Sequence, residues 1–282
     1  MNLSLSSSDV FVPDRVPVQD ALKRTTHLGI GAHQDDLELF ALHGIVDCFG
    51  RADRWFTGVT CTDGAGSPRS GAYADCSDER MKDIRHEEQR AAAAIGRYSA
   101  VIQLNHASST VKNPADPKLA DDLLAVLRAT RPALVYTHNP ADKHDTHVAV
   151  VCAVIRAIRR LPKADRPRNV YGCEVWRSLD WLTGPDKVVL DVSGHDHLGA
   201  ALTGVYDSQI AGGKRYDLAT LGRRRANATF AESHAVDTAT EAVYAMDLTP
   251  LAQDERMDVT EFVMERVRRF GQDVATRLKK KG

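Results

Sequence analysis

Histidine and aspartate side chains gather where two short apolar runs end. In the stretch GIGAHQDDLELF (29–40), His33, Asp35 and Asp36 directly follow an apolar run. More than 100 residues later, the stretch YTHNPADKHDTH (136–147) carries His144 and His147. Neutral imidazole and carboxylate are both good ligands of Zn²⁺, and a catalytic zinc site needs three protein ligands and one open position. These residue types can therefore form a metal site that activates water.

The spacing of these residues allows a division of roles. His33 and Asp36 can supply two metal ligands and His147 a third. Asp35 and Asp36 are neighbours, so their side chains point in different directions and Asp35 can stand beside the bound water as a general base. His144, if protonated, can donate a hydrogen bond to the oxyanion of a tetrahedral intermediate.

Structural roles explain each motif taken alone. An aspartate at a helix start is often only an N-cap, which would account for Asp35 or Asp36. An H-x-x-H pair and a pair of adjacent aspartates both occur frequently by chance. The combination of the two groups, each placed at the end of an expected strand, favours a shared site.

Strands and helices alternate in the first part of the chain. Apolar runs predict strands at 27–32, 55–61, 100–104 and 133–138. Helical patterns predict helices at 36–49, 79–96, 117–130 and 146–161, with Gly96 as a left-handed cap. This order is typical of a Rossmann-like α/β fold with a mostly parallel sheet and helices on both faces. Because ligands bind outside the carboxyl ends of parallel strands, the two polar groups can meet at one edge.

The second half of the chain is less regular. Segments 170–176 and 187–192 are expected to be strands and 197–210 a helix, whereas 212–236 has no clean periodicity and the basic tail is helical. We expect one domain over 1–282. It comprises an N-terminal extension (1–26), a metal-binding α/β core (27–160) and a part that completes the cleft and shapes the substrate site (161–282).

Composition excludes several classes of protein. The formal net charge is −1, so nothing global indicates a nucleic-acid or membrane partner. The five cysteines form no C-x-x-C pair, which argues against a disulfide framework. The N-terminus lacks the pattern of a signal peptide, and no stretch is apolar enough to span a membrane. We expect a cytoplasmic protein; the sequence does not indicate its oligomeric state.

Four blocks together resemble the PIG-L/LmbE-like family of zinc-dependent N-acetylglucosaminyl deacetylases. They are GAHQDDLELFALHGI, TDGAGSPR, RHEEQRAAAAIG and YTHNPADKHDTHVAV, in that order. The resemblance implies that His33, Asp36 and His147 bind zinc, although another divalent transition metal is possible. It implies that Asp35 is the general base and that His144 stabilises the oxyanion.

The resemblance also points to substrate contacts and to two departures. Asp63 lies in the T-D-G turn and Arg69 follows it, in a region where the family holds sugar hydroxyls. Asn139 and Asp145 are further candidates in the last block. Gln34 replaces the usual proline of A-H-P-D-D. The usual H-P-D-H reads HDTH here, so the aspartate that supports the oxyanion histidine is displaced.

The leading hypothesis is a zinc hydrolase that removes acetyl from an N-acetylglucosamine-type amino sugar or its conjugate. One alternative is an amidase that acts on a larger acyl group or on a thiol or antibiotic conjugate. Another is a metal-bound carbohydrate-binding protein without turnover, motivated by the altered HDTH. A nucleotide-binding protein is favoured least, because Gly29-x-Gly31 lacks the third glycine of the dinucleotide fingerprint.

Overall fold

One sheet of eight strands organises residues 1–281, which the computed structural model describes. In spatial order the strands are β1 (Asp9–Phe11), β4 (Ala100–His106), β3 (Phe56–Thr62), β2 (His27–Gly31), β5 (Leu134–His138), β6 (Asn169–Cys173), β8 (Ala242–Asp247) and β7 (Lys187–Asp191). The five central strands from β4 to β6 are parallel. Antiparallel β1 borders them on one side and antiparallel β8 and β7 on the other. The predicted mostly parallel α/β sheet is confirmed.

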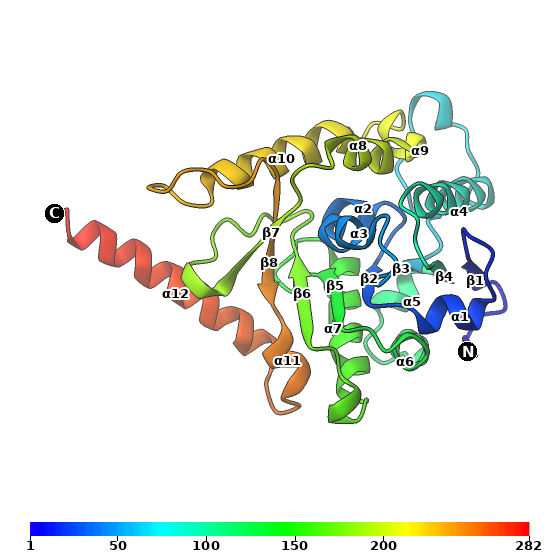
Figure 1. Cartoon of the computed structure of the whole chain (residues 1–282), viewed down its shortest axis with the longest axis horizontal. Helices are drawn as coiled ribbons and strands as arrows, with labels where there is room; N and C mark the ends of the chain where they lie inside the picture. Colours follow the sequence, from blue (N-terminus) through cyan, green and yellow to red (C-terminus); the bar gives the residue numbers. More distant parts are fainter. Residues whose placement is uncertain (282) are drawn as a thin grey trace.

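The central strands are buried on both faces because helices cover the two sides of the sheet (Figure 1). One layer contains α1 (Val18–Lys23), α5 (Ser108–Lys112), α6 (Lys118–Thr130), α7 (Asp145–Arg159) and α11 (Thr249–Gln253). The other contains α2 (Asp36–Phe40), α3 (Leu42–Cys48), α4 (Asp78–Ile95), α8 (Asp196–Gly204), α9 (Asp207–Ile210) and α10 (Tyr216–Phe230). Each face has its own apolar cluster. Near-continuous apolar strands are typical of a sheet covered in this way.

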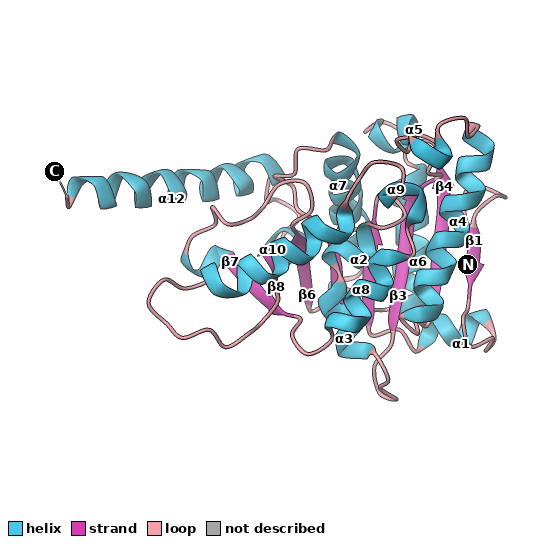
Figure 2. Cartoon of the chain, turned by 90° about the horizontal axis from the view of Figure 1, so that it is seen from above, coloured by secondary structure: helices cyan, strands magenta, loops and turns pink. Residues whose placement is uncertain are grey.

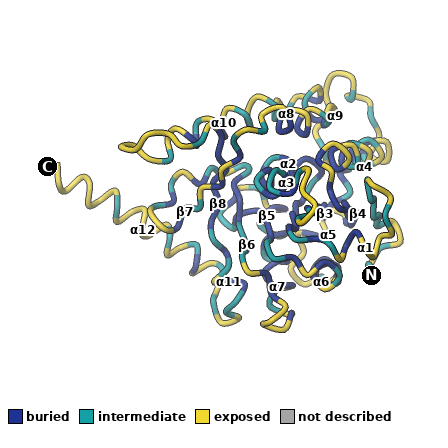
Figure 3. The backbone as a smooth tube through the Cα atoms, viewed as in Figure 1, coloured by how far each residue is buried: buried dark blue, intermediate teal, exposed yellow. Residues whose placement is uncertain are grey.

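The chain ends in α12 (Val259–Lys279), which runs away from the sheet (Figure 2). Most of its distal half is exposed, in contrast to the buried strands (Figure 3). No helix of residues 1–281 combines the length and the apolar character that crossing a membrane requires.

Two predicted elements differ in detail. The helix expected at 36–49 is divided at Ala41, which leaves helical geometry between α2 and α3. The helix ending at Gly96 was predicted correctly, but the left-handed cap was not: Gly96 has φ −75°, and Arg97 takes the positive φ of 51°. Gly96 is needed for packing instead, since a Cβ there would lie 2.4 Å from the Tyr98 ring.

The second half contains helices and a strand that the sequence did not predict with clear bounds. α10 lies within 212–236, where no periodicity was found, and β8 was not predicted at all. The single helix expected at 197–210 is two helices, α8 and α9. β8 and β7 extend the same sheet, so the part after residue 160 is continuous with the core.

Candidate metal centre

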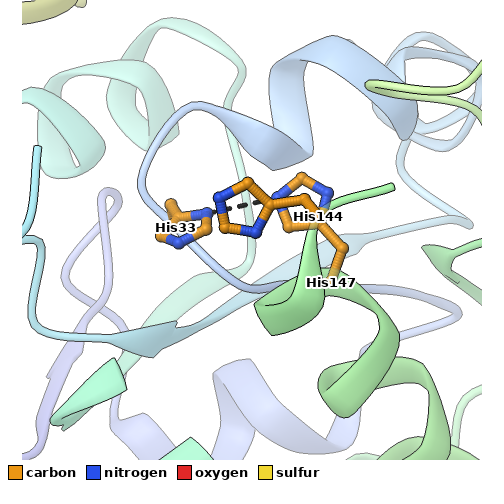
Figure 4. A group of neighbouring side chains, drawn as sticks. All are labelled: His33, His144 and His147. Atoms are coloured by element: carbon orange, nitrogen blue, oxygen red, sulfur yellow. Dashed lines mark hydrogen bonds between the residues drawn. The ribbon is translucent and has the colours of Figure 1, made fainter. Parts of the chain in front are cut away.

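Three loops at the carboxyl edge of the sheet form the candidate site. They follow β3, β2 and β5, which are adjacent and parallel. A Cβ on Gly31 would lie 2.9 Å from the Cβ of Asp36, so the glycine lets the start of α2 approach the end of β2. The histidines of the third loop come from the start of α7 (Figure 4). The predicted convergence of distant segments is therefore present.

His33, Asp36 and His147 bring two ring nitrogens and both oxygens of one carboxylate together. His33 Nδ1 lies 3.2 Å from Asp36 Oδ2, and His147 Nε2 lies 3.4 Å from Asp36 Oδ1. The two histidine nitrogens are 3.3 Å apart, as the dashed line in Figure 4 marks. Two ligands about 2.0–2.1 Å from a tetrahedral zinc ion lie about 3.3–3.4 Å from each other. The 3.3 Å between the two histidine nitrogens thus fits a tetrahedral ion of this size.

The charge states of the ligands suit a cation. Burial acts to raise the pKa of Asp36, but His147 and His138 outweigh it and hold this pKa well below its usual range. Asp36 is therefore ionised. Burial acts to lower the pKa of His147, whereas Asp36 and Asp142 raise it overall. The buried imidazole thus lies in a negative environment that favours a positive partner.

Asp142 orients His147, and the sequence analysis missed it. Its Oδ2 lies 3.2 Å from His147 Nδ1, which leaves Nε2 to face Asp36 and His33. A carboxylate on the second ring nitrogen is the usual support of a metal-binding histidine. The sequence feature that could have identified Asp142 is an acidic residue five positions before His147 in ADKHDTH.

His138 is close to the donor set but is engaged elsewhere. Its Nε2 lies 3.3 Å from Asp36 Oδ2 and accepts a hydrogen bond from the backbone N–H of Ala32 at 2.9 Å. Burial and the neighbouring His147 lower the pKa of His138 to about 4. The ring stacks on His147 with centroids 3.7 Å apart. His138 therefore buttresses His147 as a neutral ring.

Asp35 lies beside the donor set in a strained backbone conformation. Its φ is 97°, a left-handed value that non-glycine residues rarely adopt. Two residues of α4 hold it: Arg85 Nη2 lies 3.1 Å from Asp35 Oδ2, and the Asp35 N–H donates to Gln89 Oε1 at 3.4 Å. Burial raises the pKa of Asp35 to about 6 although Arg85 acts to lower it. A carboxylate with this pKa is suited to general base catalysis near neutral pH.

His144 stacks on His147, with ring centroids 4.5 Å apart. Burial, followed by the nearby His147 and His33, lowers the pKa of His144 to about 4. Its Nδ1 is buried and has no hydrogen-bond partner among the described residues. A neutral imidazole still donates one N–H, so His144 can serve an oxyanion without a full charge.

Gln34 ties its loop down in place of proline. Its side chain is fully buried, and its Nε2 donates to the Thr62 carbonyl at 3.1 Å and to Gln103 Oε1 at 3.3 Å. These bonds connect the loop after β2 to β3 and β4. Hydrogen bonds thus restrain this loop in the absence of a proline ring.

A cavity of about 800 Å³ opens in front of the donor atoms. Asp63 lines this cavity, but Arg69, Asn139 and Asp145 do not. Arg69 donates to Asp78 and to a carbonyl of its own loop, and Asn139 is buried with its side chain bonded to backbone groups. Asp145 is exposed. The remaining walls are Thr62, Gly64, Gly66, Ser67, Pro68, Arg85, Ser108, Lys112, Lys143, Thr146, Val175, Trp176, Gln209, Lys214, Tyr216 and Leu39.

Comparison with known proteins places this arrangement in a family. Residues 28–158 match the PIG-L family, described as GlcNAc-PI de-N-acetylase. A probable N-acetyl-alpha-D-glucosaminyl L-malate deacetylase 2 of Bacillus subtilis is 27% identical over 161 residues, covering 57% of this chain and 72% of that protein.

Solved structures share the fold at low identity. N,N'-diacetylchitobiose deacetylase from Pyrococcus horikoshii superposes with a TM-score of 0.59 at 17% identity, covering 78% of this chain and 83% of that chain. The hydratase GalB of Pseudomonas putida KT2440 gives 0.61 at 19% identity, covering 79% and 96%. Since a hydratase shares the fold, the fold alone does not determine the reaction.

An α/β sheet that gathers two histidines and a carboxylate on its carboxyl edge makes this an α/β protein with a candidate metal site. The chain carries a PIG-L family domain over residues 28–158 and is an enzyme of the N-deacetylase type.

Proposed function

We propose that this enzyme is a metal-dependent hydrolase that removes an N-acetyl group from an N-acetylglucosamine-type amino sugar or its conjugate. The observation that carries the proposal is the group of His33, Asp36 and His147, whose side chains approach one another in pairs to 3.2–3.4 Å, with the strained Asp35 beside them. The PIG-L match and the malate-conjugate deacetylase of Bacillus subtilis support the class of substrate.

His33, Asp36 and His147 would hold the metal, and we propose Zn²⁺ as the native ion. When bound, such an ion polarises an amide carbonyl and lowers the pKa of a water at its open position to about 7. Asp142 keeps His147 in the tautomer that presents Nε2 to the donor set. The imidazole and carboxylate groups of His33, Asp36 and His147 also suit Fe²⁺ and Co²⁺, so the identity of the bound ion is to be determined by metal analysis.

Asp35 would move the protons of the reaction. Its Oδ2 is paired with Arg85, which leaves Oδ1 to accept the proton of the attacking water and to return one to the leaving amine. His144 would donate its ring N–H to the carbonyl oxygen as negative charge develops there. The loss of one such donor typically lowers kcat by about 10²–10³-fold.

The cavity in front of the donor atoms would hold the sugar. Asp63 lines it and is the one residue of the four expected substrate contacts that we carry into the proposal. The part of the chain after residue 160 would shape the opposite wall through Trp176 and Tyr216. The five cysteines are free thiols, in keeping with the reducing cytoplasm that we propose as the location.

Asp35→Asn and Asp36→Ala provide the test, because adjacent aspartates are assigned different roles. We expect Asp35→Asn to keep wild-type metal content and to lose about 10²–10⁴-fold in amine release from N-acetylglucosamine conjugates. We expect Asp36→Ala to lose the metal. Metal content is measured by elemental analysis, and activity is assayed after chelation and readdition of Zn²⁺, Fe²⁺ or Co²⁺. Equal loss of metal in both variants would reject the assigned roles.

A further inference from the structure

A second, smaller hollow opens from the main cavity. Its volume is about 140 Å³. It shares four walls with the cavity in front of the donor atoms: Leu39, Val175, Trp176 and Tyr216. Beyond them, Ala219 and Thr220 of α10 and Val243 of β8 close the hollow, which we call the side groove. Because the four walls are common to both, a ligand at the donor atoms can extend into the side groove without a break.

The side groove offers an apolar surface although charged residues contribute to it. Arg223 and Arg224 donate to the backbone carbonyls of Val175 and Leu39. Glu174 accepts from two backbone N–H groups and a buried amide side chain. Both oxygens of Glu174 and one nitrogen of each guanidinium are thus engaged within the wall, and aromatic rings and small aliphatic side chains make up much of the rest of the side groove.

The two hollows therefore suit different chemistry. The main cavity presents Asp63, Arg85, Lys112 and Lys143, which can hydrogen-bond to sugar hydroxyls. The side groove would leave hydroxyls without partners, which is costly. An apolar cavity of about 150 Å³ accommodates a benzene ring, so the side groove has room for an aryl group or a short alkyl chain.

The side groove also begins close to the reacting atoms. The Trp176 ring stacks at 6.4 Å on the ring of His144, and Leu39 lies one helical turn after Asp35 on α2. A group attached to the amide carbonyl or to the amino sugar can reach it from the donor atoms.

We propose that the natural substrate is an amino-sugar conjugate that carries an apolar alkyl or aryl group, and that the side groove binds this group. The inference rests on the proposed function and narrows its substrate class. The apolar group is either an acyl chain longer than acetyl or an apolar aglycone. Each methylene removed from water typically gains about fourfold in binding, so a group that fills the side groove should gain about 10- to 100-fold.

Three substrates show whether the apolar group is the acyl chain or the aglycone. We compare kcat/KM for N-acetylglucosamine, N-hexanoylglucosamine and phenyl N-acetyl-β-D-glucosaminide by amine release. A gain of 10-fold or more with the hexanoyl compound alone assigns the side groove to the acyl chain, and a gain with the phenyl glycoside alone assigns it to the aglycone. The absence of a gain with either compound overturns the proposal.

Ala219→Asp places a carboxylate in the side groove, and Leu218→Asp is its matched control. Leu218 is the adjacent residue on α10, is 58% exposed and does not line the side groove. We expect Ala219→Asp to reduce the ratio of kcat/KM between the favoured substrate and N-acetylglucosamine to near one. Leu218→Asp should keep the wild-type ratio. Equal ratios in the two variants would contradict the role of the side groove.

Calorimetry on the Asp35→Asn protein separates failure of this inference from failure of the proposed function. The three compounds are titrated without turnover, with and without the added Ala219→Asp change. If an apolar compound binds more tightly than N-acetylglucosamine and Ala219→Asp abolishes this difference, the side groove is supported. This holds even if wild-type protein hydrolyses none of the three compounds, and that lack of hydrolysis would reject the hydrolase. Equal affinities for all three compounds would reject the side groove while leaving the hydrolase intact.

Discussion

Asp35 and Asp36 are chemically identical neighbours, and their surroundings separate their roles. His147 and His138 hold the pKa of Asp36 well below its usual range against the effect of burial, which suits a ligand. Burial raises the pKa of Asp35 to about 6 although Arg85 opposes the rise, which suits a base. The φ of Asp35 is positive, a backbone conformation that non-glycine residues rarely adopt. Strain of this kind persists only where neighbouring groups hold it, and here Arg85 and Gln89 do so.

Removing Asp142 should lower the metal affinity, although Asp142 is not one of the proposed metal ligands. Asp142→Ala frees His147 Nδ1, so the ring loses the bond that fixes its tautomer and orientation. We expect the metal affinity to fall about 10- to 100-fold, measured by competition with a chelator. Asp145→Ala is the control, because this nearby aspartate is exposed and lies outside the cavity. Equal metal affinities of the two variants would remove Asp142 from the site.

Arg85 should set the pH at which the base becomes active. Arg85 lowers the pKa of Asp35, so Arg85→Gln raises this pKa and the ionised base appears only at higher pH. We expect the acidic limb of the kcat/KM profile to move upward by about 1 pH unit. Arg85→Lys keeps the charge and should leave the limb near its wild-type position. A loss of activity in Arg85→Gln that is uniform across pH would mean that Arg85 acts in another way.

Residue types and spacing predicted the donor set but not its supports. His33, Asp36 and His147 were proposed because metal ligands are typically histidine or carboxylate and because both groups follow expected strands, and the structure brings these three side chains together. Asp142 and Gln89 were missed, since their contacts depend on how a turn and a neighbouring helix pack, which local sequence does not specify. The same limit explains Asn139, whose side chain bonds to backbone groups of its own surroundings.

At the scale of elements, periodicity predicted the segments that bury apolar side chains. The central strands and helices such as α6 and α7 have strong apolar faces and were predicted within about two residues of their bounds. α10 was missed because the side chains it buries are Arg224, Asn227 and Ala228, a mostly polar set. Arg224 instead donates to backbone carbonyls at the end of α2, a contact that no hydrophobic pattern encodes.

The N-terminal segment, β4 and α6 are joined at one carboxylate. Asp122 on α6 lies 2.8 Å from His106 Nε2 at the end of β4 and accepts from the Ser4 N–H and hydroxyl at 2.7 Å each. Burial acts to raise the pKa of Asp122, but these hydrogen bonds lower it overall. The bonds therefore add stability that is complete above the unfolded-state pKa near 4 and is lost as pH falls through the lower folded-state pKa.

Asp122→Ala should thus be destabilising in a pH-dependent way. We expect a loss of about 1–3 kcal/mol in the free energy of unfolding at pH 7, because buried donors lose their acceptor. The difference from wild type should shrink as pH falls below the unfolded-state pKa near 4, and should be lost as pH passes through the lower folded-state pKa of wild-type Asp122. Urea unfolding at several pH values measures both. Asp121→Ala, an exposed neighbour on the same helix, controls for general effects. A difference that stays constant down to pH 3 would contradict the role of ionised Asp122.

At the scale of the whole molecule, the sheet unites the matched family domain with the remainder of the chain. β6 is parallel to β5, and β8 and β7 continue from it, so residues after 160 are fixed to the same framework that carries the donor atoms. This continuity lets Trp176 and Tyr216 line the same cavity as His33, Asp36 and His144 of the candidate metal site. The first turns of α12 pack on the rest of the molecule, and its last turns extend past it (Figure 1).

The two halves of α12 should differ in their contribution to stability. Phe262 is 5% exposed in the apolar cluster and Arg269 Nη1 donates to Asp186 Oδ1 at 2.7 Å, whereas Leu278 is 68% exposed. A chain that ends at Phe270 keeps these body contacts, so we expect its unfolding temperature within about 2 °C of the full chain and its metal content unchanged. Phe262→Ala in the full chain should lower the unfolding temperature by about 6 °C or more, because it leaves a cavity under the helix. Thermal unfolding followed by circular dichroism compares the two. A shortened chain that unfolds as early as Phe262→Ala would show that the distal turns stabilise the molecule through contacts that their exposure does not indicate.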